Sequence, residues 1–230
     1  MSLHLLSKTC SALLDGLVAP APPDPPLPLT SLHSDLLGLL ALLASDANKL
    51  VLVVDPPGMQ PSFKAALAPL RDLTAHTSTL ASNAASFVPA VHGKALTFEV
   101  RDLAREVLQA VQDLTAALVA FIDAHLPASP REGKGKGEAH MVKVAAIHAL
   151  VDGARSIDKG ISSSNAQAVK RKWDEGGALI RDAHDELEES DLPGSGEDER
   201  DDYEDEFDFG GPASTEERAF QSQVHLLLLA

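Results

Sequence analysis

The longest regular pattern of hydrophobic and polar residues runs from Lys94 to His125. Its apolar residues recur at steps of three and four, which is the period of one helix face and not the alternation of a strand. They are Leu96, Val100, Leu103, Val107, Val111, Leu114, Leu118 and Phe121. Gly93 and Pro127 are helix breakers that bound the stretch. A single helix of this kind needs partner helices to cover its apolar face.

Five further stretches show the same spacing and can supply those partners. They are Ser2–Val18, Thr30–Val54, Pro61–Ala85, Ala139–Ile161 and Asn165–Glu189. Pro69 lies inside the third stretch and is expected to kink or interrupt it. Short loops between long helices favour antiparallel neighbours. The sequence therefore predicts an all-α fold with an up-down bundle of about five helices over residues 30–187. A short N-terminal helix at residues 1–19 and a proline-rich linker at residues 20–29 precede it.

The segment Leu50–Val54 has a second interpretation. Together with Asp55 it could be a buried strand that leads into a loop, as in nucleotide-binding sheets. No glycine-rich phosphate loop follows it, and no second strand of this type appears in the sequence. A helix is therefore the favoured interpretation.

The last helical stretch carries three features of interest. Ser164 and Gln167 have the spacing of a capping box at its start. Trp173 lies on its apolar stripe, and we expect it to fill the bundle interior, with a groove for a partner helix as the alternative. Gly176 and Gly177 weaken a helix, and close approach of a neighbouring helix could explain their presence.

Negative charge is concentrated in one part of the chain. The formal net charge is −15, and the stretch Glu188–Asp208, with twelve acidic residues and one arginine, carries −11 of it. Such a stretch repels itself and cannot bury a core. We expect residues 188–211 to be disordered and residues 212–230 to form a short C-terminal helix. An acidic chain is also a poor candidate for direct nucleic-acid binding.

The acidic stretch holds the candidate site residues. The candidates for binding a protein partner are Glu197, Asp198, Glu199, Asp201 and Asp202. Ser195 is a candidate phosphorylation site, because acidic residues follow it as acid-directed kinases prefer. A phosphate there would deepen an already negative field.

Other reactive residue types do not assemble into a recognisable site. Cys10 is the only cysteine and has neither a local histidine nor a local cause for a lowered pKa, so packing is its expected role. His184 could ligate a metal, but a solvated helix face is favoured. The glycine- and lysine-rich segment Gly133–Gly137 lacks the spacing of a phosphate-binding loop. We therefore expect no metal, no cofactor and no enzymatic activity.

Membrane and targeting signals are not expected either. The stretch Met1–Pro20 is leucine-rich but lacks a basic region before its apolar residues. The apolar run Leu36–Ala44 is too short to cross a bilayer. These patterns favour a soluble intracellular protein that does not bind membranes.

Two segments together resemble the cyclin-D-interacting protein family (GCIP type, also called cyclin-D-binding proteins). They are TFEVRDLAREVLQAVQDLTAALVAFI, from Thr97, and RKWDEGGALIRDAHDELEESD, from Arg171. The resemblance covers roughly Leu36–Asp208. Family members continue into a second helical domain and often carry a tryptophan and a cysteine in the helix that matches His148–Gly153. This chain ends at Ala230 and has neither residue there.

The resemblance implies a non-catalytic regulator in the nucleus and cytoplasm. Its implied partners are D-type cyclins and helix-loop-helix transcription factors, and its implied role is restraint of cell-cycle entry. An alternative function, taken from the acidic stretch, is a chaperone or sequestering factor for basic partners such as histones. A third is an adaptor that uses the proline-rich linker and helix grooves.

Overall fold

The structure is a computed structural model and describes residues 2–17, 26–56, 62–125, 139–156 and 160–190. Contacts divide the chain into two units, Met1–Arg181 and Asp182–Ala230. The second unit is described over residues 182–190 alone. The expected C-terminal helix, most of the acidic segment and most of the proline-rich linker therefore lie outside the described residues.

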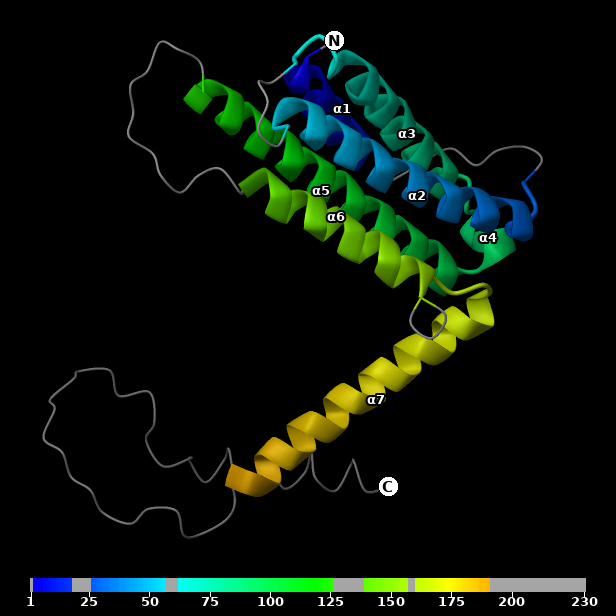
Figure 1. Ribbon diagram of the computed structural model, residues 1–230. Helices are drawn as coiled ribbons and strands as arrows, with labels where there is room; N and C mark the ends of the chain where they lie inside the picture. Colours follow the sequence, from blue (N-terminus) through cyan, green and yellow to red (C-terminus); the bar gives the residue numbers. More distant parts are fainter. Residues whose placement is uncertain (1, 18–25, 57–61, 126–138, 157–159, 191–230) are drawn as a thin grey trace, which may run out of the picture. The chain divides into compact units, whose positions relative to one another are not determined.

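The described residues form seven helices and no strand, so the all-α prediction is confirmed and the predicted number of about five is corrected. The helices are α1 (Leu3–Gly16), α2 (Leu29–Val54), α3 (Leu67–Ala85), α4 (Pro89–His92), α5 (Lys94–His125), α6 (Ala139–Arg155) and α7 (Asn165–Ser190) (Figure 1). The single turn α4 was missed because four residues are too short to show a period. Leu50–Val54 belongs to α2 and is helical, as favoured.

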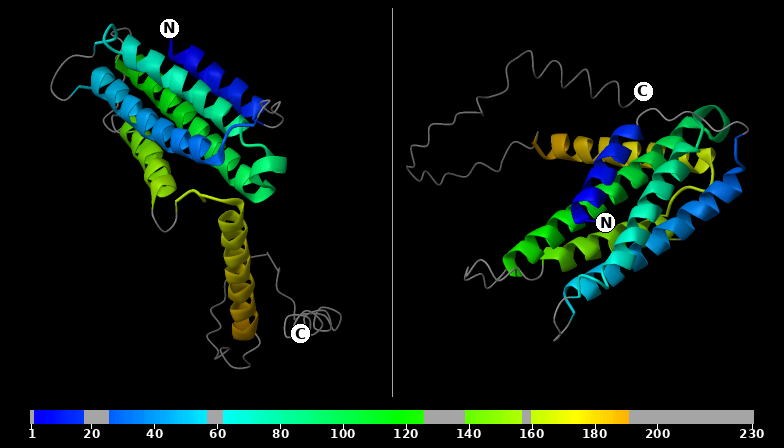
Figure 2. Two further views of the ribbon diagram at one scale, coloured as in Figure 1. Left: turned by 90° about the vertical axis from the view of Figure 1, so that its right-hand side faces the viewer. Right: turned by 90° about the horizontal axis from the view of Figure 1, so that it is seen from above.

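Five of these helices pack into a closed ring. Helix α5 contacts α1 and α6, α6 contacts α2, α2 contacts α3, and α3 contacts α1 (Figure 2). Members that follow one another along the chain run in opposite directions, as in an up-down bundle, whereas α1 and α3, which are also neighbours in the ring, run in the same direction. The membership differs from the prediction: α1 is part of the bundle, where Leu6 and Cys10 are fully buried. Helix α7 contributes only Ala168 to the hydrophobic core of the described residues.

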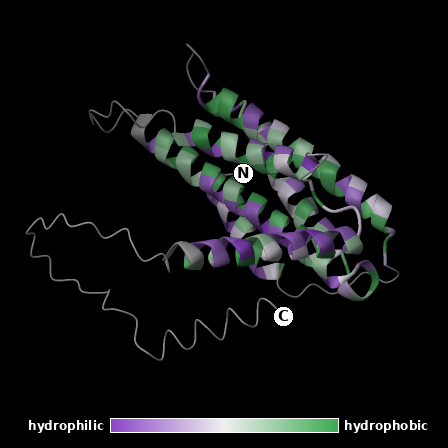
Figure 3. Cartoon of the chain, turned by 90° about the horizontal axis from the view of Figure 1, so that it is seen from below, coloured by the Kyte–Doolittle hydropathy of each residue, from purple (hydrophilic) through white to green (hydrophobic). Residues whose placement is uncertain are grey.

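The apolar stripe of α5 lies in the core, as its spacing predicts. Val100, Val107, Val111 and Leu118 are all fully buried. Hydrophobic and hydrophilic residues share each helix of the bundle in Figure 3, as expected for amphipathic helices around one core. Truncating a buried leucine of this core to alanine costs about 2–5 kcal/mol, because lost burial and an unfilled cavity add.

Helix α3 begins later than the sequence suggested, at Leu67 instead of near Pro61. Pro69 consequently lies in the first turn, where a backbone N–H has no acceptor within the helix and its absence costs little. The expected kink inside the helix was therefore wrong. Helix α6 likewise ends at Arg155 and not at Ile161.

Polar pairs also connect the bundle helices. Asp46 of α2 is 2 % exposed, and its Oδ2 lies 2.6 Å from Nδ1 of His76 on α3. Its Oδ1 accepts a hydrogen bond from Lys49 Nζ at 3.0 Å. On the opposite side of the ring, Gln112 Nε2 of α5 donates to Ser11 Oγ of α1 at 2.9 Å. A buried carboxylate such as that of Asp46 is tolerated only where partners satisfy it, so its contact with His76 favours α2 and α3 as neighbours.

Among the described helices, α2 is the one long and apolar enough to cross a membrane. Half of that apolar stretch is buried inside the protein, and the core helix of a bundle passes the same test. Its leucines at positions 36, 40 and 43 are fully buried against neighbouring helices.

Candidate interaction surface

Helix α7 is fastened to the bundle at its first residue. Asn165 Oδ1 accepts hydrogen bonds from the backbone N–H groups of Ala95 at 3.1 Å and Leu96 at 3.3 Å. Both groups lie in the first turn of α5, where N–H groups lack helical acceptors. Gly93, just before α5, has a φ of 90°, and a Cβ there would lie 2.0 Å from Asn165 Cγ. Glycine at position 93 therefore permits the contact between the starts of α5 and α7.

A second anchor follows one and a half turns later. Glu99 of α5 accepts a hydrogen bond from the backbone N–H of Ser162 at 3.0 Å and forms an ion pair with Arg171 of α7. Arg171 also donates to the carbonyl of Gly160 in the connection between α6 and α7. The two charged side chains are only 17 % and 26 % exposed, so solvent screens their attraction less than at an open surface. Three segments are thus tied together by one carboxylate and one guanidinium.

A shallow groove of about 510 Å³ lies between α5, α6 and the first turns of α7. Leu103, Leu150 and Ile161 line it together with the acidic side chains of Glu106 and Glu175. At its edge, Lys172 Nζ lies 3.9 Å from the ring centre of Phe98, a cation–π contact that again holds α7 through a charged side chain.

The apolar stripe of α7 faces away from these contacts. On this stripe Trp173 is 81 % exposed, Ile180 55 % and Val169 50 %, and Leu179 beside it is 70 % exposed. The expectation that Trp173 fills the bundle interior was therefore wrong. The physical reason is that the ring of five helices is already closed, while α7 is held by Arg171 and Lys172 on another side of the helix. The side of α7 that contacts the bundle carries Ala168 and charged side chains, whereas most of its large apolar side chains contact solvent.

The two glycines of α7, Gly176 and Gly177, have no close neighbours among the described residues. A Cβ on Gly176 or Gly177 would meet nothing within 4 Å among the described residues. The suggested close approach of a neighbouring helix of the same chain is therefore absent there. The capping box is found in a shifted form: Gln167 N–H donates to Ser164 Oγ at 3.3 Å, but the Gln167 side chain accepts from Ser163 N–H.

The sequence-predicted binding and modification residues cannot be placed on this surface. They lie outside the described part of the chain, and they are Ser195, Glu197, Asp198, Glu199, Asp201 and Asp202. His184 is described, and its Nδ1 lies 4.0 Å from Asp185 Oδ1 on α7. Among the described residues, no three metal-ligating side chains gather into a group that could hold an ion.

Cys10 is fully buried in α1, in agreement with a packing role. Burial away from water raises the pKa of its thiol to about 11, which opposes the effect of a backbone hydrogen bond. The thiol is therefore protonated at neutral pH, and the thiolate needed for nucleophilic chemistry is absent.

Sequence reasoning missed the two anchors of α7. Glu99 and Arg171 are 72 positions apart and Asn165 and Ala95 are 70 apart, so no local spacing relates them. The one sequence feature that pointed to the first anchor was Gly93, a helix breaker directly before α5. A positive φ is the conformation that glycine adopts most easily.

Comparison with known proteins gives a family for this arrangement. A family model described as Grap2 and cyclin-D-interacting, N-terminal, matches residues 35–191. No curated protein and no solved structure gave a significant match. The matched region runs from α2 to the end of α7, contains both anchors and the outward stripe, and covers well over half of the chain. This chain belongs to the Grap2 and cyclin-D-interacting protein family.

Proposed function

We propose that this protein is a non-catalytic interaction regulator that binds a helix of a partner protein on the outward apolar stripe of α7. The observation that supports the proposal is the exposure of Val169, Trp173 and Ile180 on a helix that is anchored through its charged side chains. A contiguous apolar stripe in water is unfavourable, and exposed apolar patches of this kind mark interaction sites.

The stripe has the chemistry of a helix-in-groove or helix-on-helix contact. Its residues recur at steps of four and three, so they lie in line along one side of α7. Trp173 is the natural centre, because tryptophan combines a large apolar area with few rotatable bonds and is enriched among residues that dominate binding energy. The anchors hold the helix in place before binding, which lowers the entropy cost of association.

The family name and the resemblance suggest the partner. We propose a D-type cyclin or a helix-loop-helix transcription factor as the partner, and a role in cell-cycle control. The corresponding compartments are the nucleus and the cytoplasm. The non-catalytic part of the proposal draws support from Cys10, whose thiol is buried and protonated, and from Glu99, whose carboxylate is held by Arg171.

The test is a binding measurement with the full chain. Immobilised chain is presented with a purified D-type cyclin and, separately, with a helix-loop-helix domain. A double variant, Trp173→Ala with Ile180→Ala, is expected to lose at least about tenfold in affinity, since truncated anchor residues cost 2 kcal/mol or more. The matched control is Met141→Ala with Val142→Ala, which removes two exposed apolar side chains from α6.

Two results would count against the proposal. One is the absence of binding to either partner by a chain whose helical circular dichroism is intact. The other is equal binding by the α7 variant and the α6 variant. Removal of residues 191–208 separates the alternative function: loss of binding to histones, with a steep salt dependence, would favour the acidic stretch as the binding element.

A further inference from the structure

The apolar stripe of α7 has the spacing of a coiled-coil seam. Its positions alternate by four and three residues over almost three heptads, and they are Val169, Trp173, Gly176, Ile180, Ala183 and Leu187. This is the pattern of the core positions at which two helices interlock. The ring of the bundle leaves the first part of this seam in solvent. We propose that the seam pairs with the same seam of a second copy of this chain, in antiparallel orientation.

The antiparallel register matches large side chains with small ones. When Gly176 of one copy faces Ile180 of the other, Trp173 faces Ala183 and Val169 faces Leu187, because the residue numbers run in opposite directions. The open space around Gly176 leaves room for Ile180 of the second copy. A parallel pair would instead place Trp173 against Trp173 and Gly176 against Gly176, which combines overcrowding with a void.

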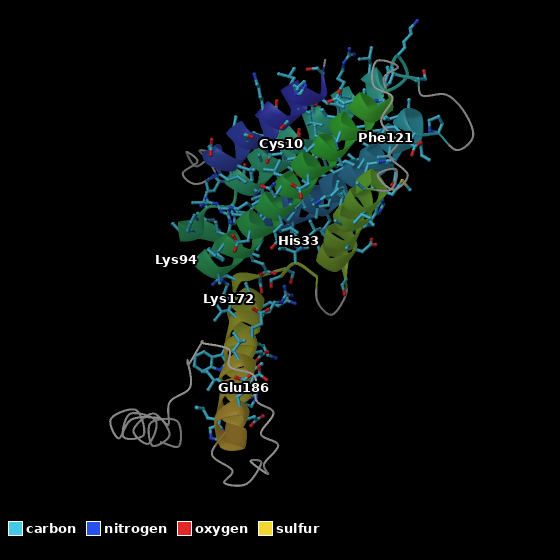
Figure 4. The ribbon with its side chains drawn as sticks, turned by 90° about the vertical axis from the view of Figure 1, so that its left-hand side faces the viewer. Cys10, His33, Lys94, Phe121, Lys172 and Glu186 are labelled. Carbon is cyan, nitrogen blue, oxygen red and sulfur yellow. The ribbon has the colours of Figure 1, made fainter. Side chains whose placement is uncertain are left out.

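Residues beside the seam fit the same register. Leu179, which is more than two-thirds exposed, meets Leu179 of the second copy near the two-fold axis. Lys172 lies opposite Glu186 of the second copy, and the symmetry produces this attractive pair twice. Both side chains are labelled on α7 in Figure 4. The antiparallel register that pairs large side chains with small ones in the seam therefore also pairs opposite charges beside it.

The charge distribution along α7 favours a second copy as the occupant. Basic residues gather in its first part, at Lys170, Arg171 and Lys172, whereas acidic residues dominate after Arg181. An antiparallel pair places the basic part of each helix on the acidic part of the other, so the helix is electrostatically complementary to itself. A parallel pair would bring like charges together. Two-fold pairing of identical surfaces is also the commonest way in which proteins form homo-oligomers.

This inference uses the same surface as the proposed partner site and adds its regulation: self-pairing would cover the stripe until a partner helix displaces the second copy. The pairing itself needs no partner. Its test therefore uses the purified chain alone, and either idea can fail without the other.

Analytical ultracentrifugation across the micromolar range tests the pairing. The expected mass rises from 24.2 kDa at low concentration toward twice that value. Trp173 is the only tryptophan, so its emission should shift to shorter wavelength as the dimer forms and buries it. Trp173→Asp is expected to remain monomeric, whereas the control Val142→Asp, on the exposed surface of α6, still dimerises. A wild-type chain that stays monomeric throughout would overturn the proposal.

Charge reversal tests the register. Glu186→Lys replaces two attractive pairs with two repulsive ones and should weaken dimerisation roughly tenfold. Lys172→Glu should do the same, and it also removes the contact with Phe98, which Lys172→Ala measures separately. The double variant restores opposite charges at both places and should return most of the affinity. A double variant that is as weak as the single variants would contradict the register.

Cysteine cross-linking tests the orientation. Val169→Cys and Leu187→Cys are prepared separately, and Cys10 gives no background because it is buried. An antiparallel pair predicts disulfide-linked dimers when the two variants are mixed, and little linkage when either is oxidised alone. Efficient linkage of Val169→Cys to itself would show a parallel pair and overturn the proposed arrangement.

Discussion

Asn165 fills the space that any side chain on residue 93 would need. A Cβ at Gly93 would lie 2.0 Å from Asn165 Cγ, and the φ of 90° at Gly93 independently disfavours other residues. One glycine thus sets both the turn before α5 and the position of the first residue of α7.

Replacing Gly93 with alanine should destabilise the protein by about 2 kcal/mol or more, because the backbone strain adds to the displacement of Asn165. Urea unfolding followed by circular dichroism measures the change. Gly153→Ala is the matched control: this glycine lies inside α6 with nothing within 4 Å of its Cβ position, so alanine there should stabilise by roughly 0.5–1 kcal/mol. Equal effects at the two positions would contradict the role given to Gly93.

Loss of the Glu99–Arg171 pair should loosen the start of α7 more than it lowers global stability. Arg171→Ala leaves the Glu99 carboxylate half-buried with one backbone donor, at a cost of about 1–3 kcal/mol. Hydrogen exchange of the amides in residues 165–175 should accelerate. The control is Arg105→Ala, which removes a more exposed pair with Asp102 on α5 and should change stability by less than about 0.5 kcal/mol.

Cys10 should be inert in the folded protein and should make stability fall at high pH. Its thiol pKa is raised from 9.0 to about 11, so the folded state holds its proton where the unfolded state loses it. The contribution of the protonated thiol to the free energy of unfolding is complete below pH 9. This contribution, about 2–3 kcal/mol, is lost as pH rises from 9 toward 11. Unfolding curves of the wild type and of Cys10→Ala across this range measure the difference. Rapid thiol labelling of the native protein at pH 8 would contradict it.

Asp113 should titrate below its ordinary pKa of 3.8. A hydrogen bond from Lys143 is the largest cause, and a hydrogen bond from Gln109 on the same helix adds to it. The resulting stabilisation is present above pH 3.8 and is lost as pH falls through the folded pKa. Both partners of the ion pair are 40 % exposed, so the effect is small and weakens in salt. NMR titration should show the pKa rising toward 3.8 in Lys143→Met.

Much of the fold follows from local spacing, whereas the arrangement of α7 does not. The stripe of α5 was predicted correctly because residues at three- and four-residue steps lie on one side of a helix, and the other bundle helices cover that side of α5. The same rule misplaced Trp173, because spacing identifies an apolar stripe and cannot say whether a neighbour covers it. Helix α1, and not α7, covers part of the apolar side of α5. Ser11 of α1 and Gln112 of α5, which are in contact, lie 101 positions apart in the sequence.

The exposed stripe of α7 and its two anchors could not be predicted from local sequence spacing either. The anchors at Asn165 and Arg171 depend on contacts with residues some 70 positions earlier, and their chemistry is that of ordinary surface side chains. Exposure of an apolar residue is a property of the whole fold. The outward stripe could therefore be found only once the bundle was seen to close without it.

The closure of the ring by α1 has a consequence for how the bundle assembles and opens. Contacts between α5 and α6 form over a short stretch of chain, but α1 must find α5 across about 100 residues, at a greater entropy of loop closure. We therefore expect docking of α1 to be a late step of folding and its release to be an early step of unfolding. Residues of α1 should report the first opening of the native protein, before the hairpin of α5 and α6 separates.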